Sequence, residues 1–181
     1  MNKTHSATQL VFCGTAMALS FITSYIQLFR MPYGGSVTCF SMLFICLIGY
    51  WYGIRAGLVT GLAYGVLQFL QEPIVLSPFQ VGCDYLFAFA GLGLAGLFMR
   101  SKHGLVKGYL FGILIRGFFH SLGGYLYWMD YMPQDFPKTL TFLYPIIYNY
   151  SYILAEGVLT ILVLMLPPVK KGLEQIQRLA M

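Results

Sequence analysis

The chain has 181 residues, of which 58% are hydrophobic and only 9% are charged, and its mean hydropathy is +0.71. Soluble domains carry roughly a quarter charged residues, so this composition excludes an ordinary soluble domain and indicates a protein whose helices lie in a lipid bilayer. The formal net charge is +5, but the basic residues are spread between apolar runs, as in the loops that orient membrane proteins. Binding to nucleic acid is therefore not expected.

Apolar runs predict six membrane-crossing helices, because about 20 helical residues span the hydrocarbon core. We expect an all-α fold in a single transmembrane domain, residues 1–181, with the second helix shorter than the others. The helices are expected at about residues 9–29, 37–52, 54–71, 79–98, 106–128 and 143–166. The first run is too long for the apolar part of a signal peptide, and no small-x-small cleavage site precedes the second. After the sixth helix, Pro167 and Pro168 lead into a short amphipathic tail.

The basic residues predict the orientation of these helices. Six crossings put both termini on one side of the membrane. That side then carries Lys3, Arg55, Arg100, Lys102, Lys107, Lys170, Lys171 and Arg178, whereas the other side carries Arg30 and Lys138. Because basic loops stay in the cytoplasm, we expect both termini to be cytoplasmic.

The four cysteines are expected to be small apolar fillers. They lie within or at the ends of apolar runs, without a C-x-x-C pair or a histidine at ligand spacing. They are Cys13, Cys39, Cys46 and Cys83. Neither a disulfide nor a metal site is predicted, and no cofactor is expected.

Small residues recur every four positions in three of the predicted helices. They are Gly53, Gly57, Gly61 and Gly65 in the third helix, Gly91 and Ala95 in the fourth, and Gly14 and Ala18 in the first. A face lined by small residues lets another backbone approach closely, as membrane helices do when they pack. Packing within the chain is the simpler interpretation, but Gly14 and Ala18 could instead dock a partner protein.

Three polar residues fall in one layer near the outer ends of three helices. At 1.5 Å per residue, Asp84 lies roughly 8 Å, His120 roughly 10 to 12 Å and Asn149 roughly 9 Å from those ends. Several aromatic residues lie close to the same layer: Tyr85, Trp128, Tyr144, Tyr148 and Tyr152. An interfacial aromatic belt explains part of this set, but it does not explain Asp84 or Asn149, so we predict an outward-facing pocket.

The chemistry of this layer favours a small aromatic solute with a positive charge. A carboxylate among aromatic faces suits a flat cation through charge pairing and cation–π contact. Asn149 offers both a donor and an acceptor to the edge of a heterocycle. His120, Gly124 and Trp128 follow one helical stripe toward the same cavity, where Gly124 leaves room for the ligand.

Arg116 and Glu156 lie deeper, each about 15 Å from the inner end of its helix. An unpaired charge near the bilayer midplane costs several kcal/mol or more. We therefore predict an ion pair between them, which would serve either as a buried strut or as a coupling element.

The chain lacks the G-x-x-x-x-G-K-[ST] motif of ATP-hydrolysing proteins and the inverted repeat of many secondary transporters. A solute-binding subunit that borrows its energy is the economical hypothesis. No serine or cysteine has the surroundings of a catalytic nucleophile. An intramembrane enzyme that uses Asp84 and His120, and a purely structural subunit, remain as alternatives.

Five pieces of sequence occur in a characteristic order and spacing. They are MPYGGSVT at Met31–Thr38, YGIRAGLVTGLAYGVLQF at Tyr52–Phe69, DYLFAFAGLGLAGLF at Asp84–Phe98, FFH at Phe118–His120 with Trp128, and Tyr144 with Asn149. By these pieces the chain resembles, over nearly its full length, the ThiT family, the thiamine-specific S components of energy-coupling factor (ECF) transporters. The resemblance implies a small six-helix protein that captures a vitamin outside the cell.

The resemblance implies a role for each matching residue. Asp84 and Tyr85 would face the cationic ligand, His120 and Trp128 would hold the thiazolium ring, and Tyr144 and Asn149 would hold the aminopyrimidine and its neighbours. The loop that contains Tyr33, Gly34, Gly35 and Ser36 would act as a lid. The family has glutamate at the position of Asp84, and its lid can carry tryptophan at the position of Gly35. The shorter acid reaches about 1.5 Å less, a gap that a water could bridge.

The resemblance also implies partners and a mechanism. Gly14 and Ala18 would dock the shared transmembrane coupling subunit, which works with two cytoplasmic ATPases. Thiamine would bind from outside, the lid would close, and the whole S component would reorient in the plasma membrane of a prokaryote. An S component for another aromatic vitamin or a thiamine precursor is the alternative that shares this fold.

Overall fold

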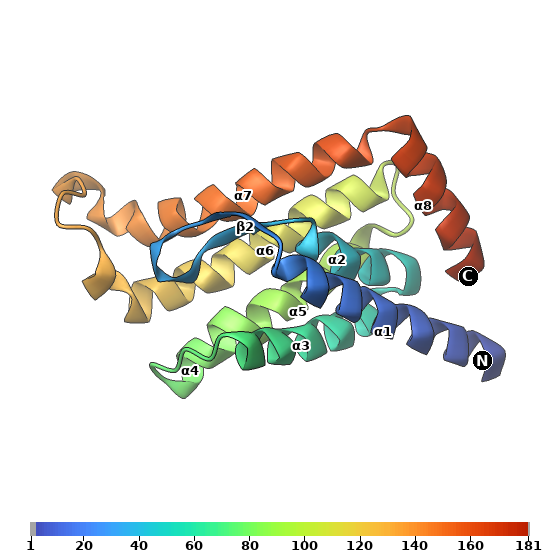
Figure 1. Cartoon of the computed structure of the whole chain (residues 1–181), viewed down its shortest axis with the longest axis horizontal. Coiled ribbons are helices and arrows are strands. Elements are labelled where there is room, and N and C mark those ends of the chain that lie inside the picture. The colour runs from blue at the N-terminus through green and yellow to red at the C-terminus, as the bar shows by residue number, and fades with distance from the viewer. Residues whose placement is uncertain (1–2, 181) are drawn as a thin grey trace.

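The computed structural model describes the backbone of residues 3–180 and the side chains of residues 7–180, and helices dominate it (Figure 1). The first half of the chain contains α1 (Lys3–Ser24), β1 (Gln27–Arg30), η1 (Pro32–Gly34), β2 (Ser36–Thr38), α2 (Ser41–Tyr52) and α3 (Ile54–Gln71). The second half contains α4 (Pro78–Val81), η2 (Gly82–Phe87), α5 (Ala88–Leu92), η3 (Gly93–Phe98), α6 (Gly104–Tyr127), η4 (Met129–Tyr131), η5 (Lys138–Leu143), α7 (Tyr144–Leu164) and α8 (Pro167–Ala180).

Within the described residues, four helical segments are long and apolar enough to cross a membrane. They are Ala7–Ser24, Pro78–Phe98, Gly104–Tyr127 and Lys138–Leu164. Large apolar side chains point away from the protein on these segments, for example Leu10, which is 75% exposed, and Leu162, which is 57% exposed. Such surfaces belong in lipid, so the structure is that of a helical membrane protein.

The segment between α1 and α2 corrects the predicted bounds of the first two helices. The first helix ends at Ser24 instead of residue 29, and the second begins at Ser41 instead of residue 37. Between them β1 and β2 form an antiparallel hairpin, in which Arg30 is opposite Ser36 and Phe29 is opposite Val37. Short apolar runs do not distinguish strand from helix by periodicity, so the sequence predicts residues 27–29 and 37–38 as helix ends, with a Pro-Gly break between them.

The predicted helix at 79–98 is one continuous run, but its hydrogen bonding changes three times along its length. The π-helical turn η2 follows α4, and after α5 the run ends in the 3-10 turn η3. A π turn holds one more residue than an α turn and often occurs at functional sites. Here it contains Asp84. The helices expected at 54–71, 106–128 and 143–166 begin and end within two residues of α3, α6 and α7.

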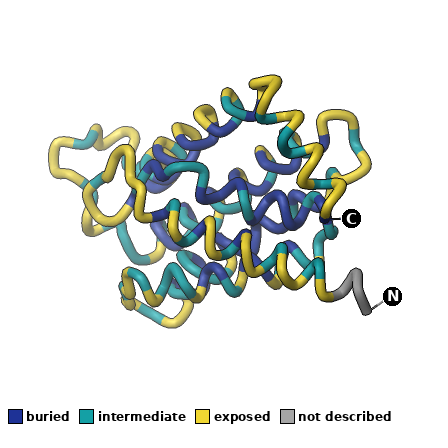
Figure 2. Tube along the Cα trace, turned by 45° about the vertical axis from the view of Figure 1, so that its right-hand side comes forward, coloured by how far each residue is buried: buried dark blue, intermediate teal, exposed yellow. Residues whose placement is uncertain are grey.

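The short helix α2 lies at the centre of the bundle, where it contacts α1, α3, α6 and η3. Ile45, Cys46 and Ile48 of α2 are fully buried, and Figure 2 shows that the buried residues gather on the inner helices. Because α2 begins only at Ser41, the hairpin and a cavity occupy the space beyond its N-terminus.

Glycines bring α3 close to the broken helix that carries Asp84. A Cβ built at Gly61 would lie 2.4 Å from the carbonyl oxygen of Phe89, and one at Gly65 would lie 2.3 Å from that of Tyr85. A Cβ at Gly93 would lie 2.1 Å from the carbonyl carbon of Gly57. The glycine stripe of α3 therefore packs within the chain, in the manner of small-residue faces in membrane helices.

The contact at Gly93 predicts a large effect of a single methyl group. Gly93→Ala should destabilise the protein by roughly 1–3 kcal/mol or more, because the methyl group meets a backbone that cannot rotate away. The measurement is the temperature at which the detergent-purified protein loses its monodisperse elution peak. Gly172→Ala is the matched control, since no atom lies within 4 Å of a Cβ built there. Equal losses of stability in the two variants would contradict this account of the packing.

Candidate functional site

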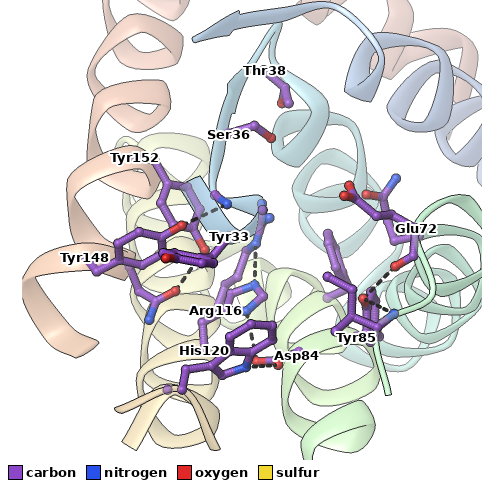
Figure 3. A pocket seen from close by; sticks show the side chains of 18 of the residues that line it. Tyr33, Ser36, Thr38, Glu72, Asp84, Tyr85, Arg116, His120, Tyr148 and Tyr152 are labelled. Atoms are coloured by element: carbon purple, nitrogen blue, oxygen red, sulfur yellow. Dashed lines mark hydrogen bonds and ion pairs between the residues drawn. The ribbon is translucent and has the colours of Figure 1, made fainter. Parts of the chain in front are cut away.

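A cavity of about 160 Å³ lies between α3, η2, α6, α7 and the hairpin. It is lined by all eight residues that the sequence predicted as a binding set: Asp84, Tyr85, His120, Gly124, Trp128, Tyr144, Tyr148 and Asn149. The predicted lid residues Tyr33, Gly34, Gly35 and Ser36 line it as well. The close-up in Figure 3 shows side chains from both halves of the chain turned toward one space.

The carboxylate of Asp84 is the centre of one wall of the cavity. Its Oδ2 accepts hydrogen bonds from Gln80 Nε2 at 2.7 Å and from Trp128 Nε1 at 3.2 Å. Its Oδ1 lies 3.4 Å from His120 Nδ1 (Figure 3). A Cβ built at Gly123 would lie 2.7 Å from the same Oδ1. The carboxylate is thus held on three sides, and the glycine of α6 makes room for it.

His120 connects Asp84 to a cation. Arg116 Nε donates a hydrogen bond to His120 Nε2 at 3.3 Å. That nitrogen is therefore the acceptor of a neutral imidazole, and the proton belongs on Nδ1, which faces Asp84. The guanidinium carbon of Arg116 also lies 4.5 Å from the centroid of the Phe89 ring, a cation–π contact. One turn of α6 therefore presents the arginine and the imidazole in line with the Asp84 carboxylate of η2.

The predicted ion pair between Arg116 and Glu156 is wrong. Within the described residues no ion pair joins them. Glu156 is 2% exposed, and it accepts hydrogen bonds from Thr38 at the end of β2 and from Ser41 and Met42 at the start of α2. The sequence prediction placed residues 37–40 inside a helix, so it provided no free N–H groups at that depth. A helix that begins at Ser41 leaves its first backbone N–H groups without partners inside the helix. The Glu156 carboxylate, which was expected to pair with Arg116, lies at this end of the helix and accepts a hydrogen bond from the Met42 amide.

Asn149 keeps part of its hydrogen-bonding capacity free. Its Nδ2 donates to the carbonyl oxygen of Pro145 at 2.8 Å, and its Oδ1 accepts from the Tyr152 hydroxyl at 3.0 Å. A primary amide has two donor hydrogens and two acceptor lone pairs, so one of each remains for a ligand. Gly124 also serves helix packing, because a Cβ there would lie 2.9 Å from Pro145 Cβ and 3.3 Å from Asn149 Nδ2.

The loop predicted as a lid is fastened to α7 by the hydroxyl of Tyr148. This hydroxyl accepts a hydrogen bond from the Gly35 amide at 3.1 Å and donates one to the carbonyl oxygen of Pro32. A Cβ built at Gly35 would lie 2.8 Å from the ring of Tyr152. The tryptophan that the family can carry at this position would not fit here without displacing that ring.

Tyr85 lines the cavity, but its hydroxyl is engaged elsewhere. It donates to the carbonyl oxygen of Glu72 at 2.7 Å and accepts from the Ile74 amide at 3.2 Å. Glu72 in turn forms an ion pair with Arg30 of β1 at 2.5 Å. The tyrosine therefore orders the loop after α3, and the ion pair joins that loop to the hairpin.

Several polar residues of the cavity were not predicted as site residues. Gln80 is 1% exposed, and its Oε1 accepts from the Leu76 amide at 3.0 Å while its amide group holds Asp84. Its position four residues before Asp84 on one helical run was the signal that could have revealed it. Ser24, Gln68 and Gln71 also line the cavity and are hydrogen-bonded to one another.

Within the described part of the chain, no group of three or more histidine, cysteine or acidic residues could hold a metal ion.

Comparison with known proteins gives consistent results. The model of a family described as thiamine transporter protein matches residues 10–175. The thiamine transporter ThiT of Bacillus subtilis (strain 168) is 28% identical over 182 residues, covering 92% of this chain and 93% of that protein. A thiamine transporter ThiT of Lacticaseibacillus paracasei is 28% identical over 172 residues, covering 84% and 81%.

The solved structure of ThiT from Listeria monocytogenes matches this fold with a TM-score of 0.69, at 22% identity over 92% of this chain and 97% of that one. At this identity the structural likeness shows the fold alone. The family match over residues 10–175 goes further and confirms the resemblance drawn from the sequence motifs. The chain belongs to the ThiT family of thiamine transporters.

Proposed function

We propose that this protein is the substrate-binding membrane subunit, or S component, that captures thiamine from outside a prokaryotic cell. It would deliver the vitamin inward together with an ECF transmembrane coupling subunit and two cytoplasmic ATPases. The proposal includes six crossings of the plasma membrane with both termini in the cytoplasm, and it includes no catalysis. The observation that carries it is the carboxylate of Asp84, held in an aromatic cavity in a chain of this family.

The groups around the cavity complement thiamine, which joins a cationic thiazolium ring to an aminopyrimidine. Asp84 and the faces of Trp128 and His120 suit the cationic ring through charge and cation–π attraction. The free donor and acceptor of Asn149 suit an aminopyrimidine edge, which offers both an N–H and a ring nitrogen. A neutral His120 adds no positive charge that would repel the ligand.

The surface of α1 supports the proposed coupling subunit. Gly14 and Ala18 are both exposed, and no atom lies within 4 Å of a Cβ built at Gly14. Packing within the chain therefore does not use this notch, in contrast to the glycines of α3. A face of small residues that is left open on a membrane helix favours close approach of another helix.

Intrinsic fluorescence of the detergent-purified chain tests the function. Thiamine should quench the emission of Trp128, which lines the cavity, with saturation at submicromolar concentration, whereas riboflavin and biotin should not. Trp51 is 6% exposed and packs against Phe12, so a Trp51→Phe variant should keep the response and a Trp128→Phe variant should lose it. A folded sample that responds to none of the three vitamins, or to another one, would refute thiamine as the ligand.

The role of Asp84 predicts the effect of removing its charge. Asp84→Asn should weaken thiamine binding about tenfold or more, because a charge-assisted contact is worth roughly 1.5–3 kcal/mol. The measurement is the dissociation constant of thiamine from the same fluorescence titration. Asp130→Asn is the matched control, since Asp130 is exposed and does not line the cavity. An unchanged affinity in a folded Asp84→Asn variant would exclude Asp84 from the binding site.

A further inference from the structure

We propose that Glu156 is a positioning residue for ligand retention: it anchors the base of the hairpin to α7 and so holds the lid closed over the cavity. This inference rests on the proposed function, because it concerns how long the bound ligand stays. It assigns a use to a buried carboxylate that forms no ion pair within the described residues.

The contacts of Glu156 come from one short piece of backbone. Its Oε2 accepts from the Thr38 amide at 2.9 Å and from the Thr38 hydroxyl at 2.6 Å. Its Oε1 accepts from the Met42 amide at 3.3 Å and from the Ser41 hydroxyl at 3.4 Å. Thr38 is the last residue of β2, and Ser41 and Met42 open α2. One side chain of α7 thus fixes the junction between the hairpin and the central helix.

A carboxylate is well suited to this junction. The first amides of α2 have no partner within the helix, and the helix N-terminus attracts negative charge. The Thr38 amide, the Thr38 hydroxyl and the Met42 amide donate to the two oxygens, and the Ser41 hydroxyl, which is hydrogen-bonded to Thr38 Oγ1 at 2.6 Å, lies 3.4 Å from Oε1. These contacts offset the cost of burying the charge at 2% exposure. An amide in the same place would turn an N–H₂ group toward at least one of these donors.

The geometry connects this anchor to the lid. Only Ser36 and Val37 separate Thr38 from the lid residue Gly35, so about 10 Å of strand lies between them. Glu156 and Tyr148 are eight residues apart on α7, about 12 Å along the helix. Helix α7 therefore holds the hairpin at two points, at the lid through Tyr148 and at the base through Glu156.

Between these two points α7 carries residues of the cavity. Asn149 and Tyr152 line it and are hydrogen-bonded to each other. When the lid leaves α7, the hairpin must turn about its base at Thr38. When the base is fixed to Glu156, the lid closes again onto Tyr148. When the base is loose, the hairpin stays in the open position for longer. The anchor should therefore govern release of the ligand and leave its entry into the open cavity unchanged.

Rates of thiamine exchange test the anchor. Glu156→Gln and Thr38→Val should each speed dissociation of bound thiamine about fivefold or more, since each removes charge-assisted hydrogen bonds. Dissociation is measured by chasing radiolabelled thiamine with unlabelled thiamine. Association, measured by stopped-flow quenching of Trp128, should change less than about twofold. The double variant should be less than additive, because both substitutions break the same link.

Thr160→Val is the matched control. Thr160 is buried one turn further along α7 and is hydrogen-bonded to the carbonyl oxygen of Glu156 and to the Tyr109 hydroxyl, without reaching the hairpin. Its dissociation rate should equal that of the wild type. An equal increase in this control would mean that any loosening of α7 has the effect, and it would overturn the proposal. Unchanged dissociation in folded Glu156→Gln and Thr38→Val variants would overturn it as well.

Hydrogen exchange of the ligand-free protein separates this inference from the proposed function. Amides of residues 33–38 should exchange faster in Glu156→Gln and Thr38→Val than in the wild type or Thr160→Val. If the wild-type protein does not bind thiamine, the proposed function fails, and this measurement still decides the anchor. Equal exchange across residues 33–38 in all four proteins would show that Glu156 does not hold the lid.

Discussion

A carboxylate inside a lipid-embedded bundle must find its hydrogen bonds within the protein, because the surrounding hydrocarbon offers none. Both deep carboxylates of this chain meet the requirement with neutral donors. Asp84 accepts hydrogen bonds from the side-chain amide of Gln80 and the indole N–H of Trp128. Glu156 accepts hydrogen bonds from the start of α2 and the end of β2. The π turn, the late start of α2 and the hairpin are the backbone features that supply or position these donors. The irregular parts of the fold are therefore also the parts that build the cavity.

Close backbone contact is the second condition for this arrangement. The Asp84 carboxylate of the π turn must lie at a fixed depth to meet its hydrogen-bond partners. The close contacts at Gly61 and Gly65 hold the helix that carries Asp84 against α3. Gly123 then lets α6 approach from the opposite side until Asp84 lies 3.4 Å from His120. A side chain at any of these glycines would move the acid relative to its partners. Packing and site chemistry are thus encoded by the same residues.

The sequence predicted most of the helices, and residue counting along them placed Asp84, His120 and Asn149 in one layer. All eight residues of the proposed binding set line the cavity. The sequence prediction failed where the backbone is irregular. Residues 25–29 and 37–38 belong to apolar runs that fit strand and helix equally well, and the Pro-Gly break between them predicts only a loop, so the sequence did not predict the hairpin. Because the prediction lacked the hairpin and began the second helix at residue 37, it did not place the start of that helix at the depth of Glu156. Arg116 was therefore predicted as the partner of Glu156. The roles of Gln80 and Tyr85 also depended on knowing which loop groups come within hydrogen-bonding distance, and spacing along the chain does not give that information.

The arrangement of Arg116 explains how an arginine can lie in a cavity proposed for a cation. A direct ion pair with Asp84 would neutralise the carboxylate before any ligand arrived, and within the described residues no such pair forms. The imidazole of His120 lies between them, so the two charges are separated by two hydrogen-bond lengths and a ring. Stacking on Phe89 gives the guanidinium a partner of its own. Asp84 therefore lines the cavity without a direct partner of opposite charge among the described residues. The imidazole ring of His120 is therefore a spacer between the two groups.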